Sequence, residues 1–219
     1  SCPGGLGILV TVGTGIICIG RNESSKIRRV AGEGHAHGDI GSGFWIGKKA
    51  IMEMALNESS VQGDEDLSEL MTHVLDKFES SDFNLAIEET MESEDSVPII
   101  ASLAEKIIEF AESGNEMALK IVQEGSSTIA EYILQLVHDL ELNPKDGSII
   151  LAGNGSVIRN DFYRKTLNDA LQFDFPNIKW TFSTISNAYG AGLLAARLHD
   201  VDVKLSQIIQ SDYYLAATR

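Results

Sequence analysis

The sequence has 219 residues, 43% of them hydrophobic and 22% charged, which is the composition of a globular protein with one large domain or two small ones. Its formal charge of −15 would repel a phosphate backbone, so nucleic-acid binding is not expected. The apolar runs are far shorter than the roughly 20 residues that span a bilayer, no signal-peptide pattern opens the chain, and two cysteines form no zinc or disulfide pattern. A cytoplasmic protein without a membrane segment is predicted.

Three short segments rich in β-branched residues come first. Residues 7–12 and 16–19 are separated by Gly13-Thr14-Gly15, which predicts a hairpin, and residues 26–30 can return as a third strand. The first part of the chain is therefore expected to form a three-stranded antiparallel meander. The Gly-Thr-Gly turn could hold a phosphate, because glycine lets oxygens approach the backbone, but it is equally good as a plain hairpin turn.

A glycine-rich loop follows at residues 32–45, with five glycines among twelve residues. Such density favours a loop shaped around a ligand, with His35, His37 and Asp39 as its polar side chains, although a tight turn without a ligand is the alternative. Because an apolar helical pattern begins directly after the loop, the helix amides are expected to point outward, where they would suit hydroxyls and anions.

Helical patterns dominate the middle of the chain. Apolar residues recur at helical spacing over 46–55, 67–78, 98–111 and 117–140, with Pro98 in a first turn and a break at 113–115. The acidic interval 88–95 is expected to be a solvated segment between helices. Helices cannot bury their stripes alone, so these segments are expected to pack on one another or on the sheet.

The last part alternates between strands and helices. A strand at 148–152, a helix at 162–171, a strand at 177–182 and a small-residue helix at 186–198 follow in order. Strands separated by helices of this length favour crossover connections. The fold class predicted is α/β, with the meander and the later strands in one mixed sheet.

Five motifs together resemble one family. Residues 10–15 and 32–42 resemble the second phosphate motif and the sugar-binding loop of the N-acetylglucosamine kinase group, within the BadF/BadG-type branch of the actin/hexokinase/Hsp70-like ATPases. Residues 110–118, 151–156 and 187–196 resemble, in the same order, its helix–Gly–Asp–helix segment, its later glycine turn and its small-residue helix near the adenosine. The resemblance covers nearly the whole chain and implies a ribonuclease-H-like (actin-like ATPase) fold.

The resemblance implies an ATP-dependent, Mg²⁺-assisted kinase for an amino sugar, N-acetylglucosamine or glucosamine. Carried over position by position, it implies two groups of residues. On the ATP and phosphate side they are Gly13, Thr14, Gly15, Gly153, Gly155, Gly190 and Ala191. On the sugar side they are Gly34, His35 and Asp39, with the carboxylate accepting hydrogen bonds from sugar hydroxyls.

Some family features are not found in this sequence. The N-terminal Asp-Gly-Gly-Gly-Thr motif and the aspartate that serves as general base do not occur, so residues 1–219 resemble the C-terminal domain of a two-domain kinase, with a helical insertion at 57–113. No catalytic residue is assigned within it, the absent domain is expected as its partner, and a homodimer stays open. Ile16 and Glu33 depart from the family pattern, and Glu33 leaves the preferred sugar open.

Two alternatives remain at this point. His35, His37 and Asp39 alternate along the loop as metal ligands can, which would suit a metal-dependent hydrolase, but three ligands from one short segment need further partners. The other alternative is a non-catalytic, sugar-sensing relative that kept the fold.

Overall fold

The computed structural model describes residues 7–34, 39–56, 65–93, 95–144 and 147–183, together with 190, 192–193, 195–196 and 199–203. The chain divides into two compact units, residues 1–182 and 183–219. The elements below belong to the first unit. Within the described residues, no helix is long and apolar enough to cross a membrane.

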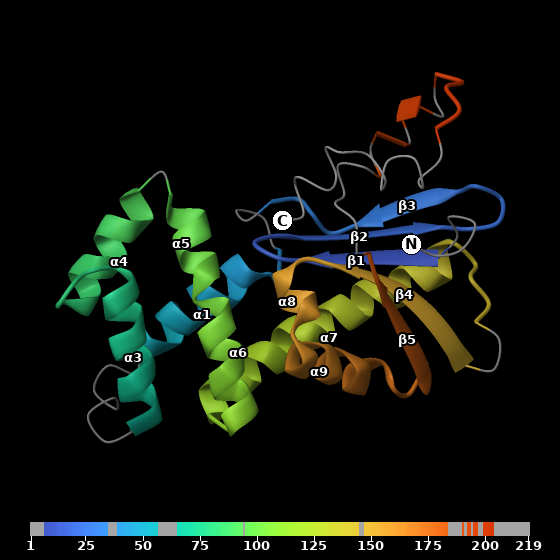
Figure 1. Cartoon of the computed structure of the whole chain (residues 1–219). Coiled ribbons are helices and arrows are strands. Elements are labelled where there is room, and N and C mark those ends of the chain that lie inside the picture. The colour runs from blue at the N-terminus through green and yellow to red at the C-terminus, as the bar shows by residue number, and fades with distance from the viewer. Residues whose placement is uncertain are drawn as a thin grey trace. The chain divides into compact units, whose positions relative to one another are not determined.

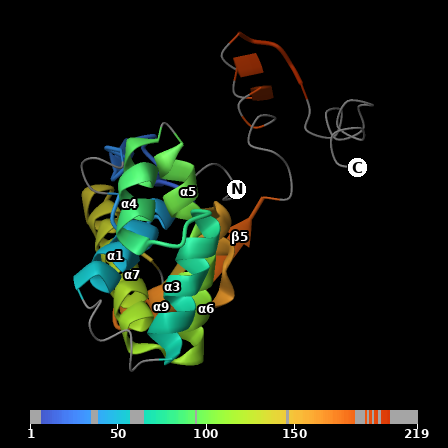
Figure 2. The same ribbon diagram turned by 90° about the vertical axis from the view of Figure 1, so that its left-hand side faces the viewer.

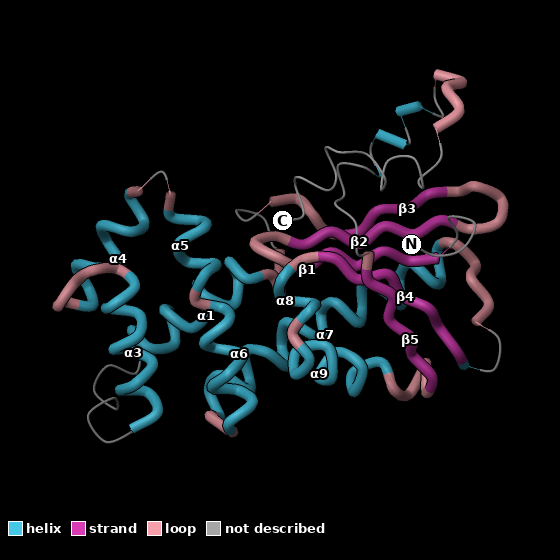
Figure 3. Tube along the Cα trace, in the orientation of Figure 1, coloured by secondary structure: helices cyan, strands magenta, loops and turns pink. Residues whose placement is uncertain are grey.

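A five-stranded mixed sheet is the centre of the first unit (Figures 1 and 3). The strands are β1 (Gly7–Val12), β2 (Ile16–Arg21), β3 (Ile27–Val30), β4 (Ser148–Asn154) and β5 (Asn177–Phe182), and their order in the sheet is β3-β2-β1-β4-β5. The pairs β1/β2 and β2/β3 are antiparallel, whereas β1/β4 and β4/β5 are parallel. The predicted meander and the mixed α/β sheet are thus confirmed.

Helices pack on one face of this sheet. The long helix α7 (Glu116–Asp139) contacts β2 and β3 and also packs against α9 (Asp161–Leu171), which follows the short helix α8 (Ser156–Arg159). Alternate residues of β1 point to this side, and Ile8, Val10 and Val12 are buried there. Figure 1 shows α7 and α9 running beneath the strands.

The remaining helices form a group beside the sheet, on the left in Figure 1. Figure 2 shows this group facing the viewer. They are α1 (Gly43–Leu56), α3 (Glu65–Lys77), α4 (Phe83–Glu92), α5 (Ser96–Ser102) and α6 (Ala104–Ser113). Helix α1 contacts α5, α6 and α7. It approaches α5 closely at Gly47, because a Cβ there would lie 3.0 Å from the carbonyl carbon of Ile100. The expected insertion at 57–113 contains α3 to α6, and its separate status stays a prediction.

Two expectations for this region were wrong. The acidic interval 88–95 is not simply a solvated connection, because its first half belongs to α4: Asp82 caps this helix by accepting from the Leu85 amide at 2.9 Å, and Phe83, Ala86 and Thr90 form a buried stripe. The helix predicted over 98–111 is instead two helices, α5 and α6, which meet at Leu103.

Cys18 lies in the core of the sheet and has no exposed surface. Burial raises the pKa of its thiol to about 12, so only about one molecule in 10⁴ carries a thiolate at pH 8. We expect iodoacetamide at pH 8 to leave Cys18 unmodified in the folded protein and to alkylate it fully in urea, as measured by mass spectrometry of its peptide. Alkylation of the folded protein at the rate of a free cysteine would contradict this placement.

Candidate functional site

Two glycine turns meet at the carboxyl ends of the parallel strands β1 and β4. The register pairs Thr11 with Asn154, so the turns that follow both strands lie at the same edge of the sheet. A Cβ built on Gly13 would lie 3.8 Å from the Cα of Gly155, and Gly155 itself has φ +96°. The structure therefore brings together the predicted phosphate turn at 13–15 and the later glycine turn, which are about 140 residues apart in sequence.

The same turn holds the start of α1. The Gly43 amide donates to the Gly13 carbonyl at 2.7 Å, and the Phe44 amide donates to the Thr14 carbonyl at 3.1 Å. The Trp45 amide donates to the buried hydroxyl of Ser42 at 3.2 Å. The amides of the first helical turn are thus used inside the protein, which corrects the expectation that they point outward to a ligand. The free carbonyls of the hairpin tip need donors, and the free amides at the start of α1 need acceptors. Each set of groups therefore satisfies the other.

Asp39 lies beside this junction and has unusual surroundings for a carboxylate. It is 8% exposed, its φ is +33°, and its Oδ1 atom has no hydrogen-bond partner within the described part of the chain. Its Oδ2 lies 2.9 Å from the position that a Cβ on Gly15 would take, so only glycine fits there without displacing the carboxylate. Burying a carboxylate oxygen without a hydrogen bond is costly, so Oδ1 is a candidate acceptor for a ligand.

Tyr132 of α7 is a neighbour of this carboxylate that sequence reasoning missed. Its pKa is raised, first by its partial burial and then by repulsion from nearby carboxylates, that of Asp39 ahead of those of Glu131 and Glu33. Tyr132 is half-buried, with its ring packed against the core. The helical stripe of α7 predicts the inward-facing residues, but no pattern in the sequence indicates which of them approach the loop.

A cavity of about 420 Å³ adjoins the second glycine turn. One wall is the start of α8 and its connection to α9, and the other comes from α5 and α6, with one residue of α3. The lining is formed by Lys77, Ala101, Ser102, Ala104, Glu105, Ile108, Ser156, Val157, Arg159 and Asn160. Its size is that of typical small-molecule sites. Sequence reasoning found the turn but not the opposite wall, because nothing in the sequence shows that α5 and α6 face it.

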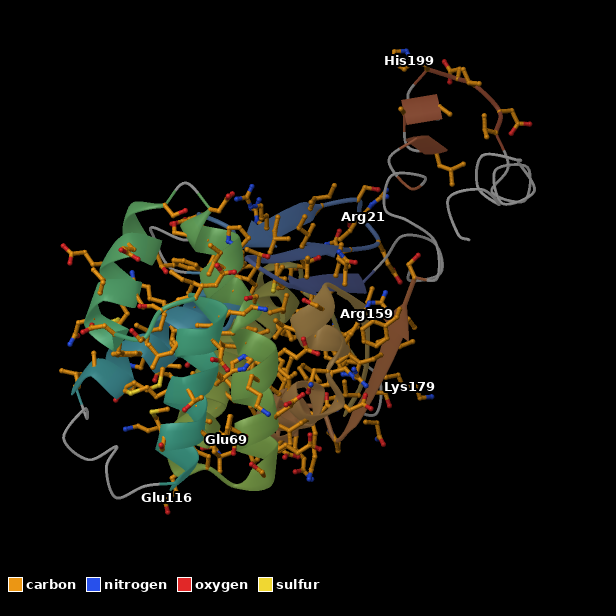
Figure 4. All side chains as sticks on the ribbon, turned by 60° about the vertical axis from the view of Figure 1, so that its left-hand side comes forward. Arg21, Glu69, Glu116, Arg159, Lys179 and His199 are labelled. Atoms are coloured by element: carbon orange, nitrogen blue, oxygen red, sulfur yellow. The ribbon has the colours of Figure 1, made fainter. Side chains whose placement is uncertain are left out.

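Arg159 links this cavity to β5. Its guanidinium lies 5.2 Å from the centre of the Phe182 ring, and that of Arg164 lies 5.1 Å from the same ring. Figure 4 shows Arg159 next to the β5 ribbon, and Lys179 on that strand extends away from the helices. These contacts fix the outer wall of the cavity. A larger cavity, of about 590 Å³, lies at the amino ends of β1 and β4 and contains none of the predicted site residues.

The other predicted site residues have different surroundings. Gly153 lies within β4, where a Cβ would meet the ring of Phe182, so its lack of a side chain makes room for that ring. Gly34 is exposed with φ +91°, and Gly190, in the second unit, has nothing within 4 Å of a Cβ position. His35, His37 and Ala191 lie outside the described residues. The part of the chain that is described contains no group of three or more His, Cys, Asp or Glu side chains able to hold a metal ion.

Comparison with known families matches most of the chain to one family. A model of the BadF/BadG/BcrA/BcrD ATPase family matches residues 2–195. The chain belongs to this family. The match includes both glycine turns, the loop with Asp39 and the α6–α7 junction, and it confirms the resemblance drawn from the motifs.

Two curated relatives of this BadF/BadG/BcrA/BcrD family member are sugar kinases by name. The chain is 30% identical over 194 residues to the N-acetylmuramic acid/N-acetylglucosamine kinase of Clostridium acetobutylicum, covering 86% of this chain and 60% of the relative. It is 23% identical over 190 residues to the N-acetyl-D-glucosamine kinase of Dictyostelium discoideum, covering 86% and 59%. The chain therefore spans about three fifths of the length of these relatives.

A solved structure supports the fold. The chain resembles a protein of Chromobacterium violaceum, provisionally assigned as an N-acetylglucosamine kinase, with a TM-score of 0.59 and 20% identity over 86% of this chain and 59% of that one. At this identity the likeness concerns the fold alone. The predicted mixed α/β fold is confirmed.

Proposed function

We propose that the full-length protein containing this chain transfers the terminal phosphoryl group of ATP to a hydroxyl of an amino sugar, N-acetylglucosamine or glucosamine. The chain would supply the sugar-binding loop and part of the ATP site. The observation that carries the proposal is the buried carboxylate of Asp39: its Oδ1 lacks a hydrogen-bond partner among the described residues, and its Oδ2 lies beside Gly15 of the hairpin turn. The names of the two kinase relatives support the same reaction.

On the sugar side, Asp39 would accept hydrogen bonds from one or two hydroxyls. A carboxylate accepts such bonds more strongly than a neutral group, and it has two oxygens to orient vicinal hydroxyls. Because its carboxylate is already desolvated, binding of a sugar would replace an unfavourable state with a hydrogen-bonded one. Gly34 and His35 would complete this side of the pocket, as the resemblance implies.

On the ATP side, Thr14 and the backbone of Gly13 and Gly15 would meet the phosphates. Thr14 is exposed at the tip of the hairpin, and the absence of a side chain at Gly13 leaves the backbone accessible between the two turns. The base and ribose would occupy the cavity of about 420 Å³ next to Gly155. Its apolar residues suit a flat base, and its charged rim suits the polar groups of a nucleotide. The family resemblance assigns Gly190 and Ala191 to the nucleotide as well.

The described residues contain no group of three or more His, Cys, Asp or Glu side chains that could hold Mg²⁺ by themselves. The ion usually binds through substrate phosphates and one or two carboxylates, so it would arrive with ATP, and its chemistry is to neutralise charge on the phosphates. In the proposed kinase, the base that takes the hydroxyl proton belongs to the part outside this chain. Within the chain, the task is to hold acceptor and donor at one edge of the sheet.

The test uses the full-length protein with ATP and Mg²⁺. ADP release would be measured with N-acetylglucosamine, glucosamine and N-acetylmuramic acid, and with glucose as the acceptor that lacks the amino group. We expect release with at least one amino sugar, saturable in that sugar, and its loss in Asp39→Ala. No ADP release with any hexosamine, or full activity in Asp39→Ala, would contradict the proposal.

The two alternative functions, a metal-dependent hydrolase and a non-catalytic sugar sensor, receive no support from the relatives, which are named as kinases. The hydrolase would need a metal bound by His35, His37 and Asp39, and two of these lie outside the described residues. A sugar sensor would bind the sugar but release no ADP, so the same assay separates it from the kinase.

A further inference from the structure

A tyrosine of α9 reaches the sugar loop from the far side of the core. Tyr163 has no exposed surface, and its hydroxyl donates to the carbonyl of Gly41 at 2.8 Å, across 122 residues of sequence. Burial raises the pKa of this hydroxyl above its ordinary range, so it remains a donor at every working pH. The bond joins α9 to the loop two residues after Asp39.

Gly41 is held on its other side by α7. A Cβ on Gly41 would lie 2.7 Å from the Gly125 carbonyl oxygen and 2.9 Å from the Tyr163 hydroxyl, and φ at Gly41 is +90°. In the reverse direction, a Cβ on Gly125 would lie 2.8 Å from the Cα of Gly41. The loop backbone is therefore fixed between two helices, and glycine is required on both surfaces of the contact.

Gly41 belongs to the same turn as the carboxylate. The Ser42 amide donates to the Asp39 carbonyl at 2.9 Å, which closes a four-residue turn with Gly41 at its third position. A positive φ at that position is the signature of a type II turn. Rotation of the Gly41 peptide would change the turn and with it the direction of the Asp39 side chain, and the hydrogen bond from Tyr163 opposes that rotation.

The tyrosine is also connected to the nucleotide side of the proposed site. Its amide donates to the side chain of Asn160 at 3.0 Å, the cap of α9, and Asn160 lines the cavity next to Gly155. Tyr163 therefore lies within one helical turn of that cavity while its hydroxyl contacts the sugar loop.

We propose that Tyr163 is a positioning residue for the sugar: its buried hydroxyl, by holding the Gly41 carbonyl, fixes the turn that directs Asp39 toward the acceptor. The inference rests on the proposed function. Tyr163 does not touch substrate, and it acts through Gly41. Its loss is therefore expected to weaken sugar binding specifically, rather than to remove the chemistry.

The test is Tyr163→Phe in the full-length protein, which keeps the ring in the core and removes only the hydroxyl. We expect the KM for the amino sugar to rise about tenfold, the loss of one hydrogen bond, while the KM for ATP and kcat change less than twofold. A merely structural role would lower the melting temperature without this split between the two KM values. The matched control is Thr166→Val, one turn along α9, whose hydroxyl donates only within the helix, to Phe162 at 3.0 Å.

Gly125→Ala tests the same contact from α7 and keeps the inference falsifiable if Tyr163→Phe folds poorly. Alanine favours a helix interior over glycine, so α7 itself gains while the new methyl group displaces Gly41. A rise in sugar KM at an unchanged ATP KM is expected again. Unchanged sugar KM in both variants, with Asp39→Ala inactive, would overturn the role of Tyr163 alone. A wild-type protein without activity would overturn the proposed function and this inference with it.

Discussion

Asp39→Asn is expected to lower kcat/KM for the amino sugar about 100-fold while the unliganded protein becomes no less stable. The substitution keeps the size of the side chain, and asparagine tolerates the positive φ of +33°. It removes the charge that would strengthen hydrogen bonds from sugar hydroxyls, and two such bonds account for roughly 3 kcal/mol. In the unliganded protein it removes a buried carboxylate oxygen that has no partner. Steady-state kinetics and thermal unfolding without sugar measure the two effects.

The control is Asp169→Asn, an exposed aspartate on α9, which should change neither quantity. A large loss of stability in Asp39→Asn would mean that the carboxylate stabilises the fold. That result would contradict the proposal that its function is to bind a ligand. Loss of activity at equal or higher stability is the pattern expected of a functional residue that the fold tolerates at a cost.

Gly155→Ala is expected to destabilise the protein by about 3 kcal/mol or more. A Cβ at this position would lie 2.6 Å from the carbonyl carbon of Val12 and 2.9 Å from the amide nitrogen of Gly13, both backbone atoms that cannot rotate away. The positive φ of +96° adds strain of roughly 1–2 kcal/mol for any residue with a side chain. Urea unfolding measures the loss, and folded material should also show a raised KM for ATP.

Gly114→Ala is the matched control for this prediction. Gly114 ends α6 with φ +102°, but nothing lies within 4 Å of a Cβ there. With ψ 8° it has the milder strain of a left-handed helix cap and no collision, and alanine there should cost only about 1 kcal/mol. Equal losses in the two variants would show that the turns at Gly13 and Gly155 can move apart, which would contradict their close contact.

Local patterns predict the sheet because its strands are short, apolar and separated by glycine turns, and residue alternation along β1 identifies its buried face. The helix α4 escaped prediction because its acidic residues hide the short buried stripe of Phe83, Ala86 and Thr90. The break at Leu103 escaped it because the apolar spacing continues through α5 and α6. Neither the start of α4 nor the boundary between α5 and α6 has a strong helix breaker such as Gly114, which ends α6.

The sequence indicates candidate-site residues that need a particular backbone, but it does not indicate those whose place depends on packing. Gly13, Gly15 and Asp39 are recognisable because glycine spacing and a carboxylate stand in one local motif. Tyr163 could not be found in this way, since its partner is 122 residues distant and its position in α9 looks like any core residue. The prediction that the α1 amides point outward was wrong for the same reason, because their acceptors belong to a hairpin about thirty residues earlier.

The two hydrogen bonds from the start of α1 to Gly13 and Thr14 have a mechanical consequence. They join the hairpin that would meet the phosphates and the segment that carries Asp39 into one piece of backbone. In the proposed kinase, the half of the active site in this chain would then move as a rigid block, and its donor and acceptor subsites could not be adjusted separately. A ligand that shifts the hairpin tip would change the affinity for the sugar, and the sugar would change the affinity for that ligand by the same factor.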